Sequence, residues 1–207
     1  MKKNAGISTM MVTGMAAFVS IFVMVLLVIL RNTIGDQSDN SKALADAEAR
    51  AKTVLTECEK DISNAEINVE WDAVKSALVC ASKEQFIVTW IMNGNVYRVA
   101  IPYSNGKTTD EEKFEDAMAQ ARAFLDVKPD QEDPYASVRA TQQTLAINFS
   151  TFDVNVVDAG AKVKVRANYT ETDKKGKSTN KIYENSLNVN HSTGTVGYRA
   201  AHPKTAE

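Results

Sequence analysis

The residues that could carry chemistry in this chain are few, and none is arranged as a known catalytic or metal site. The only histidines are His191 and His202, and neither belongs to a His-Glu-x-x-His motif. No Gly-x-Ser-x-Gly motif occurs, and the spacing of Cys58 and Cys80 is not that of a zinc site. We therefore expect no catalytic residue, no metal ligand and no cofactor.

Two further groups of residues resemble parts of active sites. Asn105-Gly106-Lys107-Thr108 looks like the end of a phosphate-binding loop, but the full pattern needs a glycine where this chain has Ile101. Four carboxylates could meet in three dimensions, although nothing in the sequence distinguishes them from a solvated acidic face: Asp110, Glu111, Asp130 and Asp133. A membrane-anchored envelope enzyme therefore stays only as an alternative.

The most polarised surface feature is a row of cations in the C-terminal part, at Lys162, Lys164, Arg166, Lys174, Lys175, Lys177 and Lys181. Such a basic patch could contact anionic lipid headgroups, an acidic partner or nucleic acid. An ordinary solvated strand face is the alternative. The net charge of −2 and the pI near 5.8 argue against nucleic acid as a partner.

Cys58 and Cys80 are the only cysteines. A disulfide between them would close a loop of about twenty residues and stabilise the fold by about 3 kcal/mol in the chain-entropy model. The alternative is a pair of buried thiols that do not meet, which small apolar cysteines often form.

An uncharged, mostly apolar run extends from residue 4 to residue 30, with Lys2 and Lys3 before it and Arg31 after it. A helix needs about 20 such residues to cross a bilayer. We expect a transmembrane helix over residues 7–31, with residues 1–6 in the cytoplasm because the short basic end stays inside. A cleaved secretory signal is the competing interpretation, but the apolar core is long and no small-x-small site follows it.

The chain after the span should form one extracytoplasmic domain anchored in the inner membrane. Residues 32–40 are polar and predict a flexible linker, residues 41–199 predict an α+β domain, and residues 200–207 predict a flexible tail. Within the domain, three-and-four spacing predicts a helix from Ser41 to Ala65. We expect its seam to mediate packing or interaction, through Leu44, Ala51, Val54, Leu55 and Ile62.

The rest of the domain predicts a second helix and an antiparallel sheet. Residues 86–101 predict a β-hairpin around Asn93-Gly94, and residues 109–126 predict a helix capped by Thr109. Residues 71–82 are compatible with either a helix or a buried strand. After residue 134 the alternation is that of strands, with a phase shift that predicts a bulge near Ser150 and Thr151, and a last short strand at Val196 and Tyr198.

The first sixty residues resemble a type IV pilin or pilin-like precursor. Met1-Lys2-Lys3-Asn4-Ala5-Gly6 matches a short basic leader ending in glycine, with Ile7 as the new terminus. The apolar run to Leu30 and the amphipathic segment from Ser41 to Ala65 match the long helix of that family, which packs on an antiparallel sheet. The resemblance implies a filament subunit of the minor-pilin type.

From these observations we expect a non-catalytic, single-pass membrane subunit of a bacterial or phage-encoded envelope assembly of the secretion, pilus or conjugation type. Its partners would be the membrane and other envelope subunits, in a homo- or hetero-oligomer. A pilin-like filament subunit is the first alternative. A phage lysis protein, either a holin or a holin regulator, is another alternative from a different class.

The leader offers a direct test of the choice between anchor and pilin. The pilin family usually has Glu at the fifth position after the leader, and this chain has Met11 there. We therefore predict that the mature chain begins near Met1 and is not cut after Gly6. Mass spectrometry of protein from its native host measures this, and a methylated terminus at Ile7 would establish the pilin-like alternative instead.

Overall fold

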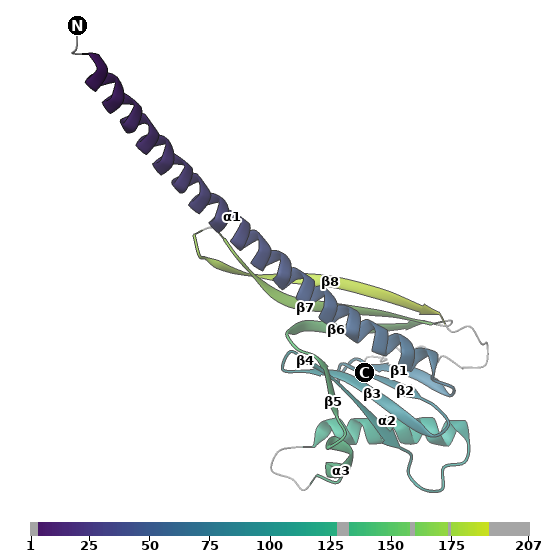
Figure 1. The fold of residues 1–207 in the computed structure, drawn as a ribbon. Coiled ribbons are helices and arrows are strands. Elements are labelled where there is room, and N and C mark those ends of the chain that lie inside the picture. The colour runs from purple at the N-terminus through teal and green to yellow at the C-terminus, as the bar shows by residue number, and fades with distance from the viewer. Residues whose placement is uncertain (1–3, 128–132, 158–159, 174, 191–207) are drawn as a thin grey trace, which may run out of the picture. The chain divides into compact units, whose positions relative to one another are not determined.

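The computed structural model describes residues 4–127, 133–157, 160–173 and 175–190, with side chains at 23–27 and, in those ranges, from 38 to 189. These described residues form one very long helix, two shorter helices and eight strands, which are labelled in Figure 1. The chain divides into two compact units. Residues 1–44 and 170–180 form the first unit, and residues 45–169 and 181–207 form the second.

Helix α1 (Asn4–Ser63) is continuous over 60 residues and confirms the predicted helix after Ser41. It corrects the prediction of a flexible linker, because residues 32–40 are helical. The segment contains no proline, and its one glycine, Gly35, weakens a helix by only about 1 kcal/mol. At residue 40, where this segment ends, the Asn40 side chain donates to the Thr172 carbonyl and accepts from the Thr172 N–H, each at 2.9 Å.

The predicted membrane span falls within the N-terminal part of α1. Among the residues that the structure describes, no helix is both long and apolar enough to cross a membrane. Most side chains of residues 7–31 lie outside the described part, as do the tail at 200–207 and the strand expected at Val196 and Tyr198.

The first sheet is a five-stranded antiparallel meander in the order β1 (Asn68–Asp72), β2 (Ala77–Ala81), β3 (Gln85–Met92), β4 (Asn95–Pro102) and β5 (Gln143–Ala146). Residues 77–81 are therefore a strand, which is buried on both faces. The hairpin prediction is confirmed. Asn93 and Gly94 have φ values of 52° and 76°, which the tight turn between β3 and β4 requires.

The second sheet contains β6 (Phe149–Val157), β7 (Gly160–Thr172) and β8 (Ser178–Asn190), in that order. The chain changes sheet at Ile147 and Asn148, where Asn148 has a φ of 62° that Asn tolerates better than most residues. Phe149 N–H then donates to the Gly94 carbonyl at 2.8 Å. The predicted bulge is confirmed, because the β6–β7 register shifts between Phe149 and Thr151.

Helix α2 (Asp110–Asp126) is confirmed together with its cap. Thr109 Oγ1 accepts from the Glu112 N–H, and the Glu112 carboxylate accepts from the Thr109 N–H. This reciprocal pair satisfies two donors at the helix start. A four-residue helix, α3 (Ala136–Arg139), follows and contacts β4.

Two apolar clusters lie on opposite faces of the five-stranded sheet. On one face, the α1 residues from Ala47 to Ile62 pack with Leu78 and Cys80 of β2 and with the inward side chains of β6 and β7. On the other face, α2 packs on β2, β3 and β4. The architecture of the second unit is thus α+β, with α1 and the small sheet covering one face and α2 the other (Figure 1).

Most of the predicted seam is part of this intramolecular core. Ala51, Val54, Leu55 and Ile62 are buried, whereas Leu44 is 39% exposed. Leu44 therefore lies outside the buried part of the predicted seam. It lies on the same helical stripe, but the first buried residue of the core cluster on α1 is Ala47.

We predict that Leu55→Asp destabilises the domain from about Ser41 to Tyr198 by several kcal/mol, because it places an unpaired charge at a position only 6% exposed. Thr56→Asp on the exposed neighbour is the matched control and should change the free energy of unfolding by less than about 0.5 kcal/mol. Denaturant unfolding followed by tryptophan fluorescence, with gel filtration, measures both. A stable, monomeric Leu55→Asp domain would show that the seam faces another subunit.

Candidate functional site

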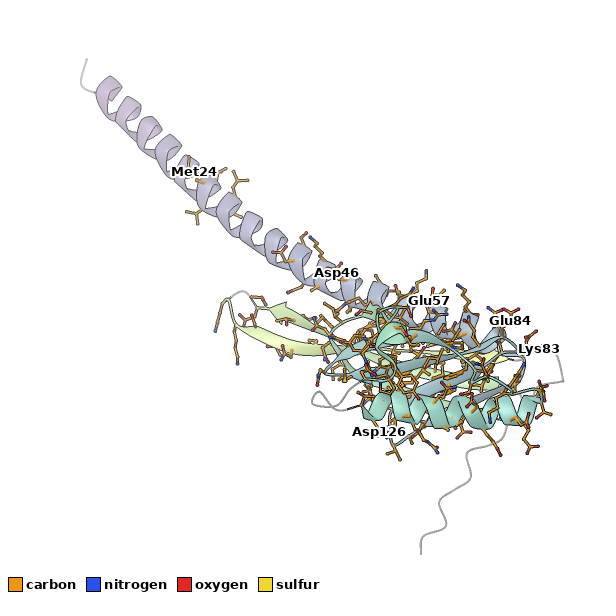
Figure 2. All side chains as sticks on the ribbon, turned by 90° about the horizontal axis from the view of Figure 1, so that it is seen from below. Met24, Asp46, Glu57, Lys83, Glu84 and Asp126 are labelled. Carbon is orange, nitrogen blue, oxygen red and sulfur yellow. The ribbon has the colours of Figure 1, made fainter. Side chains whose placement is uncertain are left out.

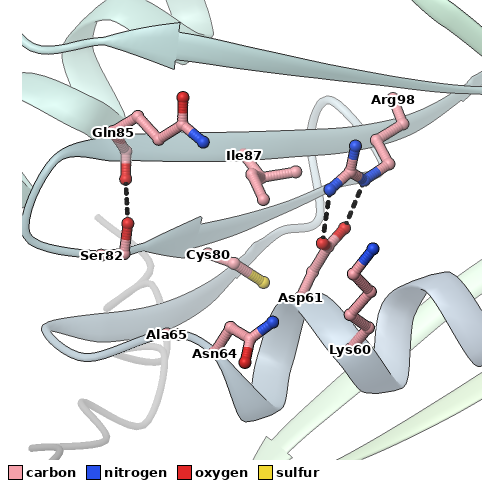
Figure 3. A pocket seen from close by; sticks show the side chains of 9 residues that line it. All are labelled: Lys60, Asp61, Asn64, Ala65, Cys80, Ser82, Gln85, Ile87 and Arg98. Atoms are coloured by element: carbon pink, nitrogen blue, oxygen red, sulfur yellow. Dashed lines mark hydrogen bonds and ion pairs between the residues drawn. The ribbon is translucent and has the colours of Figure 1, made fainter.

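A pocket lies in the second unit, where the last turn of α1 meets β2, β3 and β4. Its volume is about 220 Å³. Figure 3 shows the residues that line it: Lys60, Asp61, Asn64, Ala65, Cys80, Ser82, Gln85, Ile87 and Arg98. The pocket therefore combines two cations, one carboxylate and three neutral polar side chains with a small apolar surface.

A bidentate ion pair between Asp61 and Arg98 dominates the pocket. Arg98 Nε donates to Asp61 Oδ2 and Nη2 donates to Oδ1, both at 2.7 Å. The side chain of Asp61 is 2% exposed and that of Arg98 is 15% exposed. Because both groups are largely withdrawn from water, each depends on the other to compensate its buried charge.

Neighbouring core residues fix the two partners of this pair. Asp61 precedes the fully buried Ile62 on α1 and lies one turn after Cys58. Arg98 lies on β4, where it pairs with Thr89 of β3 and Gln143 of β5. Burial raises the pKa of the Asp61 carboxyl above its ordinary value, although the hydrogen bonds from Arg98 act in the opposite direction.

The rim of the pocket carries the remaining polar groups. Lys60 and Asn64 belong to the end of α1, and Lys60 lies beside the ion pair (Figure 3). On the opposite side, Ser82 Oγ donates to the Gln85 carbonyl at 2.7 Å, which closes the turn between β2 and β3. Lys60, Asn64 and Gln85 are exposed. The rim can therefore offer an ammonium group and two side-chain amides to a ligand.

Cys80 lines the same pocket, and Cys58 lies in the same apolar cluster. Both are buried and carry free thiols in the structure. Burial raises the pKa of both thiols, so neither is poised as a nucleophile. The disulfide between Cys58 and Cys80 stays a prediction. In the structure both residues are buried free thiols, which corresponds to the alternative.

The predicted basic patch is partly neutralised where its side chains are described. Lys164 Nζ and Arg166 Nε both bind the carboxylate of Glu184 on β8, at 2.8 and 2.6 Å. These two contacts lower the pKa of Glu184. Lys162, Lys175, Lys177 and Lys181 are exposed, and Lys174 lies outside the described residues. On the strands, Lys164 and Arg166 of the patch therefore form ordinary cross-strand ion pairs with Glu184.

The other candidate residues from the sequence do not converge. Thr108 and Thr109 cap α2 through Glu112, so the loop that resembles a phosphate site is a helix start. Asp133 binds Arg139 at 2.6 Å, and Asp130 lies outside the described residues. Within the described chain, no group of three or more histidine, cysteine or acidic side chains could hold a metal ion.

Sequence reasoning missed Asp61 and Arg98. A signal for Asp61 existed, because it interrupts the apolar stripe of α1 between Cys58 and Ile62. A charge on the buried face of a helix requires a partner. No comparable signal identified Arg98, since an arginine in an alternating strand is normally on the wet face.

Comparison of the chain with protein-family models, with curated proteins and with solved structures finds no match in any of the three.

We predict that Arg98→Met destabilises the protein by about 3–5 kcal/mol, because it leaves the Asp61 charge buried and unpaired. The double variant Asp61→Leu, Arg98→Met should recover most of that loss. Arg166→Met is the matched control, because the Arg166–Glu184 pair is about half exposed and its loss should change the free energy of unfolding far less.

The same variant should show a diagnostic pH dependence in chemical denaturation. The folded pKa of Asp61 lies above its unfolded value and should rise further without Arg98. A raised carboxyl pKa gives stability that is present below the unfolded pKa, about 4, and is lost as the pH rises through the folded pKa. The deficit of Arg98→Met relative to wild type should therefore shrink as the pH falls from the raised folded pKa of the variant towards about 4 and be smallest there. A pH-independent deficit would contradict the buried-charge explanation.

Proposed function

We propose that this protein is a non-catalytic subunit of a bacterial or phage-encoded cell-envelope assembly, anchored in the inner membrane by the N-terminal part of α1. The domain that follows the anchor acts outside the cytoplasm through contacts with other subunits. The proposal rests on the apolar surface of α1 and on the uncharged run around it.

The observation that carries the proposal is an exposed apolar segment of α1. Its described side chains are all large and apolar, and all are more than two fifths exposed: Val23, Met24, Val25, Leu26 and Leu27. Met24 is 71% exposed and projects away from the helix (Figure 2). Five consecutive helical positions cover every side of the helix. A helix that is apolar on all sides needs an apolar environment, such as a bilayer or a protein assembly.

A pilin-like filament subunit is the second candidate, and the continuity of α1 favours it. The resemblance implies a single helix whose N-terminal part is apolar and whose C-terminal part packs on a sheet. α1 runs unbroken through residues 32–40, and its residues from Ala47 to Ile62 belong to a sheet-bound core. This candidate differs from the first in two observable respects, namely cleavage after Gly6 and the recovery of filaments.

We predict that the full chain, expressed in bacteria, stays in the membrane pellet after an alkaline carbonate wash. Its domain should be cleaved by external protease only once the outer barrier is opened. The double variant Val23→Arg, Leu27→Arg should move to the soluble fraction, because an arginine inside a span costs up to about 2.5–3.5 kcal/mol on insertion scales, with the largest cost at the centre.

The matched control for this experiment is Val23→Leu, Leu27→Val, which keeps the apolar surface and should remain in the pellet. Wild-type protein in the soluble fraction would reject the anchor. Equal retention of the arginine variant would show that the apolar segment does not anchor the chain. Growth arrest with loss of membrane potential on expression would favour a lysis protein.

A further inference from the structure

The pocket beneath the end of α1 has an unbalanced charge. Its lining contains Lys60 and Arg98 as cations and Asp61 as the single carboxylate. The carboxylate oxygens of Asp61 already accept two hydrogen bonds from Arg98. The lining therefore retains one positive charge, which a ligand could neutralise.

The hydrogen-bond donors of the pocket also exceed the acceptors that the structure supplies. The bonds to Asp61 use Nε and Nη2 of Arg98, so the Nη1 edge of the guanidinium keeps its two N–H groups for another acceptor. Lys60 adds an ammonium group, and Asn64 and Gln85 add side-chain amides at the rim. This set of donors suits an anion with several acceptor oxygens.

Two features of the surroundings work against an anion. The C-terminal end of α1 carries a partial negative charge, but its last carbonyls are partly satisfied, because the N–H groups of Asn64 and Ala65 donate to Lys60 and Ile62. Glu57, one turn before Asp61, does not line the pocket, but its negative charge acts on both Asp61 and Arg98. A cation would fare worse, since Arg98 already occupies Asp61 and Lys60 would repel it.

We propose that this pocket binds a carboxylate group through Lys60 and through the free Nη1 edge of Arg98, which lies on the side of the guanidinium away from Asp61 (Figure 3). The volume of about 220 Å³ accommodates a small carboxylate, and Ile87 and Ala65 provide apolar contact for a short carbon chain. The carboxylate has two sources with the same chemistry. It belongs either to a small free acid or to an acidic side chain of a second copy, and the second source rests on the proposed assembly function.

The test is a titration of the ¹⁵N-labelled full chain in detergent micelles with succinate, at constant ionic strength in chloride. Succinate should shift the Arg98 Nε–H signal and the backbone amides of Ser82 and Gln85 in a saturable way. Succinamide, which has the same shape without the charge, should not shift them. Absence of saturable shifts at these groups, or equal shifts with succinamide, would overturn the proposal.

Two lysine variants sharpen this test. Lys60→Gln should weaken succinate binding at least threefold, because it removes the free cation of the pocket. Lys83→Gln is the matched control, since Lys83 is exposed on the adjacent β2–β3 turn and does not line the pocket. Equal weakening by both variants would indicate general screening of charge and reject the site.

Analytical ultracentrifugation of the same samples distinguishes the two sources. If the bound carboxylate comes from a second copy, saturating succinate should dissociate oligomers of the wild type, and Lys60→Gln should already be less associated. If it comes from a free acid, succinate should bind without changing the oligomeric state. Membrane retention is measured separately, so failure of this site leaves the proposed anchoring function intact and testable.

Discussion

The burial of one face of α1 is the interaction on which the second unit depends. The side chains from Ala47 to Ile62 pack with both the five-stranded sheet and the small sheet of β6, β7 and β8. Small residues at Ala47, Ala51 and Cys58 let the helix approach both sheets closely. Without this helix, the sheet face that carries Leu78 and Cys80 would be covered only by the small sheet, while α2 would still cover the opposite face.

The Asp61–Arg98 ion pair joins the end of α1 to one position on the sheet. A helix that packs only through alanine and valine can slide along a sheet at small cost, because such contacts are non-directional. Two hydrogen bonds of 2.7 Å from β4 to the last turn of α1 fix the register of the helix. The same pair creates the polar pocket, so the structural constraint and the candidate binding site share their central residues. A register role of this kind is the best-attested use of a buried ion pair.

The sequence predicted the elements that depend on local signals. The Asn93-Gly94 turn, the Thr109 cap and the bulge after Phe149 each follow from a few neighbouring residues, and the structure confirms them. The division into two sheets was not predictable, because it depends on the positive φ of Asn148 and on long-range contacts of Gly94. The linker prediction over residues 32–40 was wrong in its secondary structure, since polar composition alone does not break a helix.

The pocket was hidden from sequence reasoning for a related reason. Its lining residues come from α1, β2, β3, β4 and their connections, which are separated by up to 38 positions along the chain, from Lys60 to Arg98. Only Asp61 carried a local signal, as a charge within an apolar stripe. By contrast, the cations of the basic patch lie close together in the sequence and therefore predicted a contact surface. In the structure, Lys164 and Arg166 share one carboxylate across the strands.

Helix α1 runs without interruption from the apolar N-terminal segment to the residues that form the core of the second unit, Ala47 to Ile62. Hydrogen exchange of the full chain in micelles tests this continuity directly, since helical amides exchange slowly and linker amides exchange at nearly the unfolded rate. We expect amides at residues 33–40 to be protected, and those from Ala47 to Ile62 to be as slow as those of β2. Fast exchange confined to residues 33–40 would contradict a continuous helix and restore a flexible linker between anchor and domain.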